Sequence, residues 1–230
     1  MCTSLISNRN KTIVGWNLDL LNMECKVTAQ SERVYISVKT QEEGWLPLFG
    51  ANNRGEFIAM PTCWPHDGRS DPSGEESTSI IMLDIELLLG RKTFEQVLIE
   101  AKAGRVHSEK GITYQAQLSD GKGNVLQIVP GQGYIYKEKP LYSVLINFSP
   151  FKGEREKHPW MGLDRYNKAV EMLEQADDDF DVRDCFEILK STSQSVCPTV
   201  VSMVFDVTEN TVYWCENQRW DNVVCKRMER

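Results

Sequence analysis

The first 20 residues constrain the fold of this chain more than any other stretch, because they read as a β-hairpin at the start of the sequence. Two short apolar, β-prone runs, Leu5-Ile6 and Ile13-Val14, flank the polar cluster Asn8-Arg9-Asn10-Lys11, a pattern typical of two strands joined by a turn. Terminal residues are usually frayed, whereas this pattern predicts an N-terminus tied into a sheet. If Met1 is removed, the thiol of Cys2 and a free α-amine share one ordered carbon atom.

Length and composition favour a globular protein. With 230 residues, 41% hydrophobic and 26% charged, the chain can bury a substantial core, and we predict one domain over 1–230. No stretch approaches the roughly 18 consecutive apolar residues of a membrane helix, and the start does not resemble a secretory signal peptide. We therefore expect a cytoplasmic protein with no membrane partner. The net charge of -7, without a sustained Lys/Arg run, predicts no nucleic-acid partner.

The seven cysteines are scattered and form no CxxC pair, which argues against a disulfide framework and against a structural zinc site. The stretch Cys63-Trp64-Pro65-His66 has the spacing of a two-ligand metal clip, but with no second pair it also suits an ordinary loop. The glycine pairs in "PGQGY" and "GKGN" precede no helix, so we interpret them as turns and not as phosphate-binding loops. We predict no metal and no cofactor.

Hydrophobic periodicity places further elements along the chain. A loop is expected over 63–79, where Pro, Gly, Ser and Asp are frequent. Strands, then paired helices, then strands predict an α+β fold in which two sheets are covered by helices. The predicted helices are 80–104, 163–175 and 182–190, and the further predicted strands are 112–118, 125–129, 142–148, 200–207 and 211–215.

Five short motifs, spread over most of the chain, occur in an order that is informative when they are taken together. They are Met1-Cys2-Thr3, Gly15-x-Asn17-x-Asp19, Asn53-x-Gly55, Asn147 at the end of a hydrophobic strand, and Arg165-Tyr166 at the start of a helix. In this order the chain resembles the choloylglycine hydrolase and penicillin V acylase family, linear-amide C–N hydrolases of the N-terminal-nucleophile superfamily. The resemblance implies a four-layer αββα sandwich and a small-molecule amide as substrate, and it leaves a homo-oligomer open.

The chemistry that the resemblance implies is consistent with the residues present. A cysteine thiolate is the most nucleophilic side chain, and an N-terminal amine with a pKa near 7.7 to 8.0 can act as its base at neutral pH. No histidine is then required, and the three histidines of the chain lie in no recognisable Cys/His motif. The resemblance makes Cys2 the nucleophile, a partly exposed and activated thiol, with most other cysteines buried. The alternative is that Cys2 is an incidental second residue.

Two further positions match active-site residues of the family. The resemblance implies that Asp19, at the end of the second strand of the hairpin, orients the amine and the thiol. It also implies that Asn147, at the end of the apolar run 142–146, stabilises an oxyanion, a contribution of roughly 3 to 4 kcal/mol per donor. The alternatives are an ordinary strand-end turn residue at Asp19 and a strand-capping asparagine at Asn147.

Arg165 lies in the first turn of the predicted helix 163–175. A cation there is disfavoured by the helix dipole, and Arg165 borders the apolar face that we expect for this helix, which consists of Leu163, Tyr166, Val170 and Leu173. A specific partner for Arg165 is therefore expected, and the family has an active-site arginine at the matching position. The alternative is a solvated arginine whose stem packs along the apolar edge.

The chain departs from the family at two positions. Trp16 stands where the family usually has an arginine, and the second oxyanion asparagine would fall near Pro61 or Thr62, where none exists. We assign Trp16 and Thr62 to substrate binding, and we expect Trp16 to favour an apolar or aromatic acyl group. Two other functions stay open: an inactive relative that acts as a binding protein, and a different enzyme built on Cys63 and His66.

Overall fold

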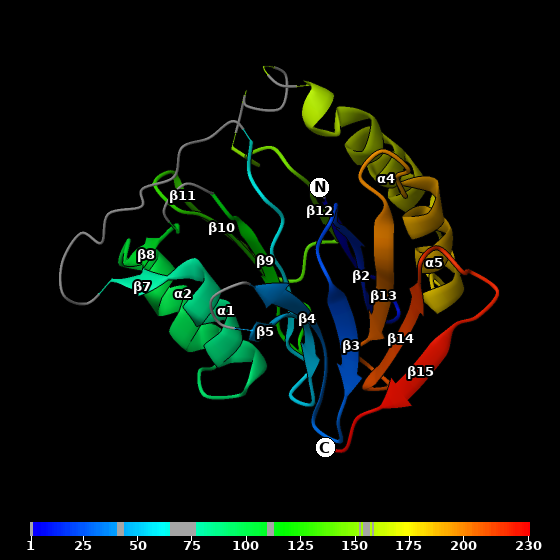
Figure 1. The fold of residues 1–230 in the computed structure, drawn as a ribbon, viewed down its shortest axis with the longest axis horizontal. Helices are drawn as coiled ribbons and strands as arrows, with labels where there is room; N and C mark the ends of the chain where they lie inside the picture. Colours follow the sequence, from blue (N-terminus) through cyan, green and yellow to red (C-terminus); the bar gives the residue numbers. More distant parts are fainter. Residues whose placement is uncertain are drawn as a thin grey trace.

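The computed structural model describes residues 2–40, 44–64, 77–109, 113–151, 153, 157 and 159–230. Two antiparallel sheets lie face to face at the centre, and helices cover the outer face of each (Figure 1). The architecture is therefore the four-layer αββα sandwich that the sequence predicts. Among the described residues, no helix is both long and apolar enough to cross a membrane.

The six-stranded sheet contains the start of the chain and has the strand order β12-β1-β2-β13-β14-β15. The hairpin of β1 and β2 lies at its centre, with Cys2 opposite Leu18, so the predicted ordering of the N-terminus is confirmed. The strands of this sheet are β1 (Cys2–Asn8), β2 (Thr12–Asp19), β12 (Tyr142–Leu145), β13 (Thr199–Asp206), β14 (Thr211–Glu216) and β15 (Val224–Arg227).

The seven-stranded sheet has the order β11-β10-β9-β6-β5-β4-β3. Its strands are β3 (Cys25–Ala29), β4 (Arg33–Thr40), β5 (Gly44–Asn52), β6 (Phe57–Ala59), β9 (Ala116–Ser119), β10 (Val125–Val129) and β11 (Gly133–Lys137). Most of this sheet was not predicted. Pro47 and Gly50 interrupt the pattern of β5, and the sheet tolerates Pro47 because the register with β4 shifts next to it.

Helices α4 (Leu163–Gln175) and α5 (Val182–Ser191) pack on the six-stranded sheet, and α1 (Ile80–Leu88) and α2 (Phe94–Lys102) pack on the seven-stranded sheet. The structure also contains the short 3-10 helix η1 (Pro159–Met161) and the parallel pair β7 (Thr78–Ser79) and β8 (Val106–His107). The predictions for α4 and α5 are confirmed almost to the residue.

The predicted helix 80–104 is wrong as one element, because it is interrupted after α1. Gly90 has a φ of 74°, a conformation that favours glycine, and Thr93 then begins α2 with a capping box that it forms with Gln96. The predicted strand 112–118 is shorter, since β9 starts at Ala116. Most of the predicted loop 63–79 lies outside the described residues, and its last two residues form β7.

Gly15 allows α5 to lie close to the middle of β2. A Cβ atom at Gly15 would lie 2.6 Å from the Sγ atom of Cys185, which is closer than such atoms approach, and a tight 3.1 Å from the Leu5 side chain. The glycine of the Gly15-x-Asn17-x-Asp19 motif therefore serves helix–sheet packing. Asn17 serves the same contact, because its Nδ2 atom donates to the Leu189 carbonyl of α5 at 2.7 Å.

Candidate active site

Cys2 is the first residue of β1, and β1 lies between β12 and β2. In an antiparallel sheet the start of one strand lies beside the ends of its neighbours, so Asp19 at the end of β2 and Asn147 just beyond β12 come close to Cys2. The backbone nitrogen of Cys2 donates to Oδ1 of Asn147 at 2.8 Å. A nitrogen that becomes the chain terminus when Met1 is removed is therefore held by a buried side chain.

Asn147 does not belong to a strand, although the sequence predicts that β12 extends to residue 148. The strand ends at Leu145 because Nε2 of Gln115 takes the place of ladder partners, donating to the carbonyls of Ile146 at 2.7 Å and of Phe148 at 3.1 Å. The Nδ2 group of Asn147 donates to the Thr62 carbonyl at 2.9 Å and to Thr62 Oγ1 at 3.1 Å. The amide donor of Asn147 is thus engaged in this structure.

Arg165 reaches the same cluster from the first turn of α4. Its guanidinium donates to the Cys2 carbonyl at 2.8 Å, to Thr3 Oγ1 at 2.9 Å and to Asn147 Oδ1 at 3.0 Å. The side chain is only 6% exposed, so the alternative of a solvated arginine is wrong. The buried residues of α4 are Arg165, Ala169 and Leu173, which places Arg165 on the buried stripe and not at its border.

Gly162, which precedes α4, makes room for this guanidinium. It has a φ of 98°, and an added Cβ atom would overlap the guanidinium of Arg165. A glycine at this position therefore serves both the backbone conformation and the burial of the arginine. The sequence offered no reason to single it out.

Asp19 is fully buried and paired. Its Oδ1 atom accepts a hydrogen bond from Thr199 Oγ1 at 2.6 Å, its Oδ2 atom accepts one from Gln194 Nε2, and Oδ2 lies 3.8 Å from Nη1 of Arg165. Burial raises the pKa of Asp19 to about 6, while the hydrogen bond from Thr199 and the charge of Arg165 act in the opposite direction. Asp19 and Arg165 form a buried ion pair directly behind Cys2.

The thiol of Cys2 differs from its prediction, because it is buried and not partly exposed. Cys2 is 6% exposed and belongs to the apolar cluster between the sheets. Burial raises the pKa of the thiol to about 12, opposed by the charge of the terminal amine. Three of the other six cysteines are buried, two are partly buried and Cys225 is exposed.

Trp16 is a core residue. Its side chain is fully buried on the same face of β2 as Leu18, and its ring packs on Phe49 with 5.4 Å between the centroids. The assignment of Trp16 as a residue that touches substrate is therefore wrong in this structure, because none of its surface is accessible. Thr62 is partly buried and bonded both to Asn147 and to Nε1 of Trp64.

The structure brings Cys2, Asp19, Asn147 and Arg165 into one cluster, as the resemblance implies. Thr3, Gln194 and Thr199 belong to it as well, and the sequence analysis did not assign them. Thr3 had a signal, since it lies in the quoted Met1-Cys2-Thr3 motif. The others had none, because they meet Asp19 only through the pairing of β2 with β13. For the alternative site at Cys63 and His66, His66 lies outside the described residues.

Known proteins resemble this chain in fold and not in sequence. No protein-family model and no curated protein sequence matches this chain. Solved structures do: two variants of a conjugated bile acid hydrolase from Clostridium perfringens match over 99% and 98% of this chain and 92% of theirs, with TM-scores of 0.68 and 0.66 at 12% and 13% identity. Penicillin V acylase from Agrobacterium tumefaciens matches over 99% of this chain and 86% of its own, with a TM-score of 0.70 at 13% identity.

This is the fold of the choloylglycine hydrolase family. A Caenorhabditis elegans orthologue of N-acylethanolamine-hydrolyzing acid amidase has it too, with a TM-score of 0.62 at 14% identity over 90% of this chain and 93% of its own. The named relatives are all amide hydrolases. At these identities the match establishes the fold, and the activity has to be argued from the residues of this chain.

Proposed function

We propose that this protein hydrolyses linear amide C–N bonds, with Cys2 as the nucleophile after removal of Met1. The observation that carries the proposal is the position of the Cys2 backbone nitrogen, which donates to Asn147 Oδ1 at 2.8 Å while Arg165 donates to the same oxygen at 3.0 Å. Because this acceptor is a side-chain oxygen that Arg165 also holds, the nitrogen has a defined orientation next to the thiol. The amide hydrolases that share the fold are consistent with this reading.

The proposed reaction begins at the Cys2 amine. The neutral α-amine takes the thiol proton, and the thiolate attacks the carbonyl carbon of the amide, so that a C–S bond forms and the carbonyl oxygen becomes an oxyanion. Collapse of this intermediate breaks the C–N bond, and the α-ammonium protonates the departing amine. Water then attacks the thioester with the α-amine as base, releasing the acid and restoring the thiol.

The proposed mechanism depends on the amine, because the thiol is hard to ionise where it lies. Burial favours the neutral thiol, which raises its pKa to about 12. Removal of Met1 places an ammonium on the same carbon atom, and a cation this close favours the thiolate. In this proposal Arg165 is a positioning residue that fixes the Cys2 carbonyl and the Asn147 oxygen, and Asp19 balances its charge.

Asn147 and a backbone N–H are the proposed oxyanion donors. Because Nδ2 of Asn147 is bonded to Thr62, a substrate oxygen has to replace at least one of these two contacts. A developing negative charge accepts a stronger hydrogen bond than a neutral carbonyl or hydroxyl oxygen. The exchange therefore favours the transition state over the bound substrate, which is what accelerates a reaction.

The proposed acyl group is apolar or aromatic. Cys2 belongs to the same apolar cluster as Trp16 and Leu18, and Trp16 replaces the arginine of the family with a neutral side chain. Trp16 is buried and does not touch the acyl group, but it supplies no cation that could offset the lost hydration of a carboxylated acyl group next to Cys2. A neutral alkyl or aryl group has no such cost.

The test is a panel of anilides with octanoyl, phenylacetyl, acetyl and succinyl groups, assayed on the wild type, Cys2→Ala and Cys225→Ala. Cys225 is the matched control because it is the exposed cysteine of the chain. We expect turnover of the octanoyl and phenylacetyl compounds by the wild type and Cys225→Ala, and none by Cys2→Ala. Equal turnover by Cys2→Ala would contradict the proposal.

A second candidate function is that of an inactive relative that binds an amide without cleaving it. The observation that favours it is the engagement of the Asn147 donor by Thr62, together with the raised pKa of the thiol. The anilide panel described above distinguishes a catalyst from a binding protein. If the protein only binds amides, an anilide should raise its melting temperature, and no aniline should be released under any condition.

A further inference from the structure

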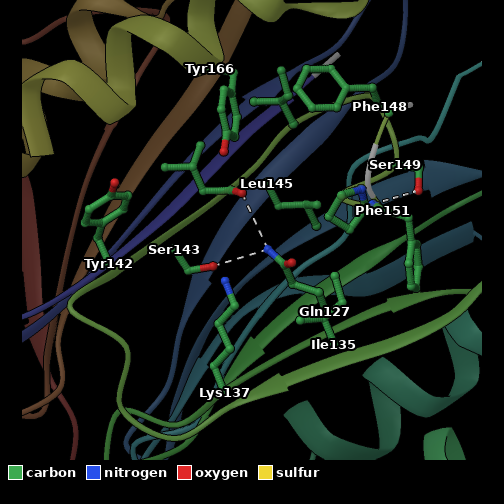
Figure 2. A pocket seen from close by; sticks show the side chains of 14 residues that line it. Gln127, Ile135, Lys137, Tyr142, Ser143, Leu145, Phe148, Ser149, Phe151 and Tyr166 are labelled. Carbon is green, nitrogen blue, oxygen red and sulfur yellow. Dashed lines mark hydrogen bonds between the residues drawn. The ribbon is translucent and has the colours of Figure 1, made fainter. Parts of the chain in front are cut away.

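A second region of the molecule has the features of a ligand site. A cavity of about 400 Å³ opens between β11 and β12, which are the outermost strands of the two sheets on the same side of the sandwich. Figure 2 shows its lining, to which residues 149–151 and Tyr166 of α4 also contribute. Cys2 is not part of the lining. The volume is within the range of about 300 to 1,000 Å³ that small-molecule sites have.

One part of the lining is apolar, and two of its aromatic rings pack against each other. Ile135, Leu145 and Phe151 contribute aliphatic and aromatic surface. Phe148 packs against the ring of Tyr166, with 5.5 Å between the centroids and 59° between the planes. A ligand in this cavity therefore needs an alkyl or aryl body, because a fully polar molecule would lose its hydration against these side chains.

The polar part of the lining contains a single charge. Lys137, at the end of β11, is the charged side chain among the described lining residues, and it is exposed. Within the described part of the chain its ammonium forms no ion pair or hydrogen bond, whereas Lys11, Lys39 and Lys168 each pair with a carboxylate. In Figure 2 its ammonium points toward Ser143 and Gln127 at the cavity wall.

Gln127 offers a second polar group. Its Nε2 atom is fully used, donating to Gln117 Oε1 at 2.8 Å and to Ser143 Oγ at 3.2 Å. Its Oε1 atom accepts no hydrogen bond from any described residue. The residue is only 5% exposed, so this oxygen needs a donor from water, because a carboxylate ligand accepts hydrogen bonds and has none to donate.

We propose that this cavity binds a small amphiphilic carboxylate, with its alkyl or aryl body against Phe148 and Phe151 and its carboxylate paired with Lys137. A cationic amphiphile would meet Lys137 as a like charge. A neutral amphiphile would gain no attraction from the ammonium. The occupant thus has a negatively charged end and an apolar end.

The site is separate from the cluster around Cys2 but shares a chain segment with it. Ile146 and Phe148 line the cavity, and the residue between them is Asn147, which accepts the hydrogen bond from the Cys2 nitrogen. The proposal does not rest on hydrolysis by Cys2. It predicts binding even by a protein in which the thiol is absent.

Isothermal titration calorimetry with octanoate tests the proposal, with octylammonium as the probe of opposite charge. We expect octanoate to bind the wild type, and Lys137→Met to bind it about tenfold more weakly, as for the loss of a charge-assisted hydrogen bond. Lys122→Met is the matched control, since Lys122 is exposed in a nearby turn and outside the cavity, and it should bind like the wild type. Octylammonium should not bind.

Each other outcome overturns the proposal. Absence of octanoate binding to the wild type at millimolar concentration shows that the cavity is not such a site. Equal binding by Lys137→Met, or binding of octylammonium, shows that Lys137 does not select the ligand. Loss of octanoate binding in Cys2→Ala, with Lys137 intact, places the ligand in the candidate active site instead. Because Lys137 is exposed, its substitution should not unfold the protein.

Discussion

Arg165 donates a 2.8 Å hydrogen bond to the backbone carbonyl of Cys2, although 163 positions separate them in the sequence. The same guanidinium bonds to Asn147 and lies 3.8 Å from the carboxylate of Asp19. One buried cation therefore joins the first strand, the last residue of the second strand and the segment after β12. Its removal leaves the buried carboxylate of Asp19 without its counter-ion and takes one donor each from the Cys2 carbonyl, Thr3 Oγ1 and Asn147 Oδ1.

The first prediction follows from this arrangement. Arg165→Met should lower the free energy of unfolding by about 3 to 5 kcal/mol, the usual cost of breaking a buried ion pair from one side. Arg165→Lys should recover part of this loss, because a single ammonium can replace the charge but not the forked set of contacts. Urea unfolding measures both. Arg183→Met, an exposed arginine of α5, should change stability by less than about 0.5 kcal/mol.

The second prediction concerns Asp19 and pH. Its pKa is raised from 3.8 to about 6 in the folded protein, so the folded state holds the proton more tightly than the unfolded state. The stability from this group is present below about pH 4 and is lost as pH rises through about 6, a change of about 3 kcal/mol at 1.36 kcal/mol per unit. Asn cannot titrate, so Asp19→Asn should lack this component of the pH dependence.

Urea unfolding at pH 4, 5, 6 and 7 tests it. The stability of the wild type relative to Asp19→Asn should decrease from pH 4 to about pH 6 and level off by pH 7. The matched variant Asp164→Asn, which alters an exposed aspartate of α4, should show no comparable trend. A difference between wild type and Asp19→Asn that stays constant from pH 4 to pH 7 would show that burial does not raise the pKa of Asp19.

The third prediction tests the contact of α5 with the hairpin. Gly15→Ala should destabilise the protein by about 1 to 3 kcal/mol, since the new methyl group overlaps the Cys185 sulfur. Cys185→Ala removes that sulfur, so Gly15→Ala should cost clearly less in the Cys185→Ala background. A double-mutant cycle from urea unfolding measures the coupling. Additive effects would mean that the two residues are not in contact.

The fourth prediction concerns the order of cysteine alkylation. Alkylation requires both access and thiolate, and the structure buries Cys2, raises the pKa of its thiol and exposes Cys225. Iodoacetamide at neutral pH should therefore label Cys225 first, and amide hydrolysis should survive that first modification. Peptide mass spectrometry over time gives the order. Labelling of Cys2 ahead of Cys225 would show that the thiol is far more activated than its burial allows.

Sequence patterns were sufficient where a signal is local. The hairpin of β1 and β2 has apolar runs around a polar turn, and α4 and α5 have clear helical spacing. In the seven-stranded sheet, β6 was missed because it has only three residues, and β5 because it contains Pro47 and Gly50, which usually interrupt strands. The break between α1 and α2 was missed because apolar spacing continues across Gly90.

The candidate site was predictable only through the order of motifs. Asp19, Asn147 and Arg165 come from three separate elements, and nothing local to Arg165 indicates that its partners are Cys2 and Asn147. The exposure of Cys2 and the accessibility of Trp16 could not be predicted, because both depend on how the two sheets pack against each other. The position of a residue in a strand indicates on which face of the sheet its side chain lies. What packs against that face depends on the tertiary structure.

The central claim, that Cys2 is an N-terminal nucleophile, is tested most directly by the N-terminal peptide of the active protein. We expect mass spectrometry of the purified, active protein to show a chain that starts at Cys2. After acid quench during turnover of an octanoyl anilide, a fraction of that peptide should carry an octanoyl group on Cys2. Full activity from a chain that retains Met1, with no acyl group on Cys2, would contradict the account.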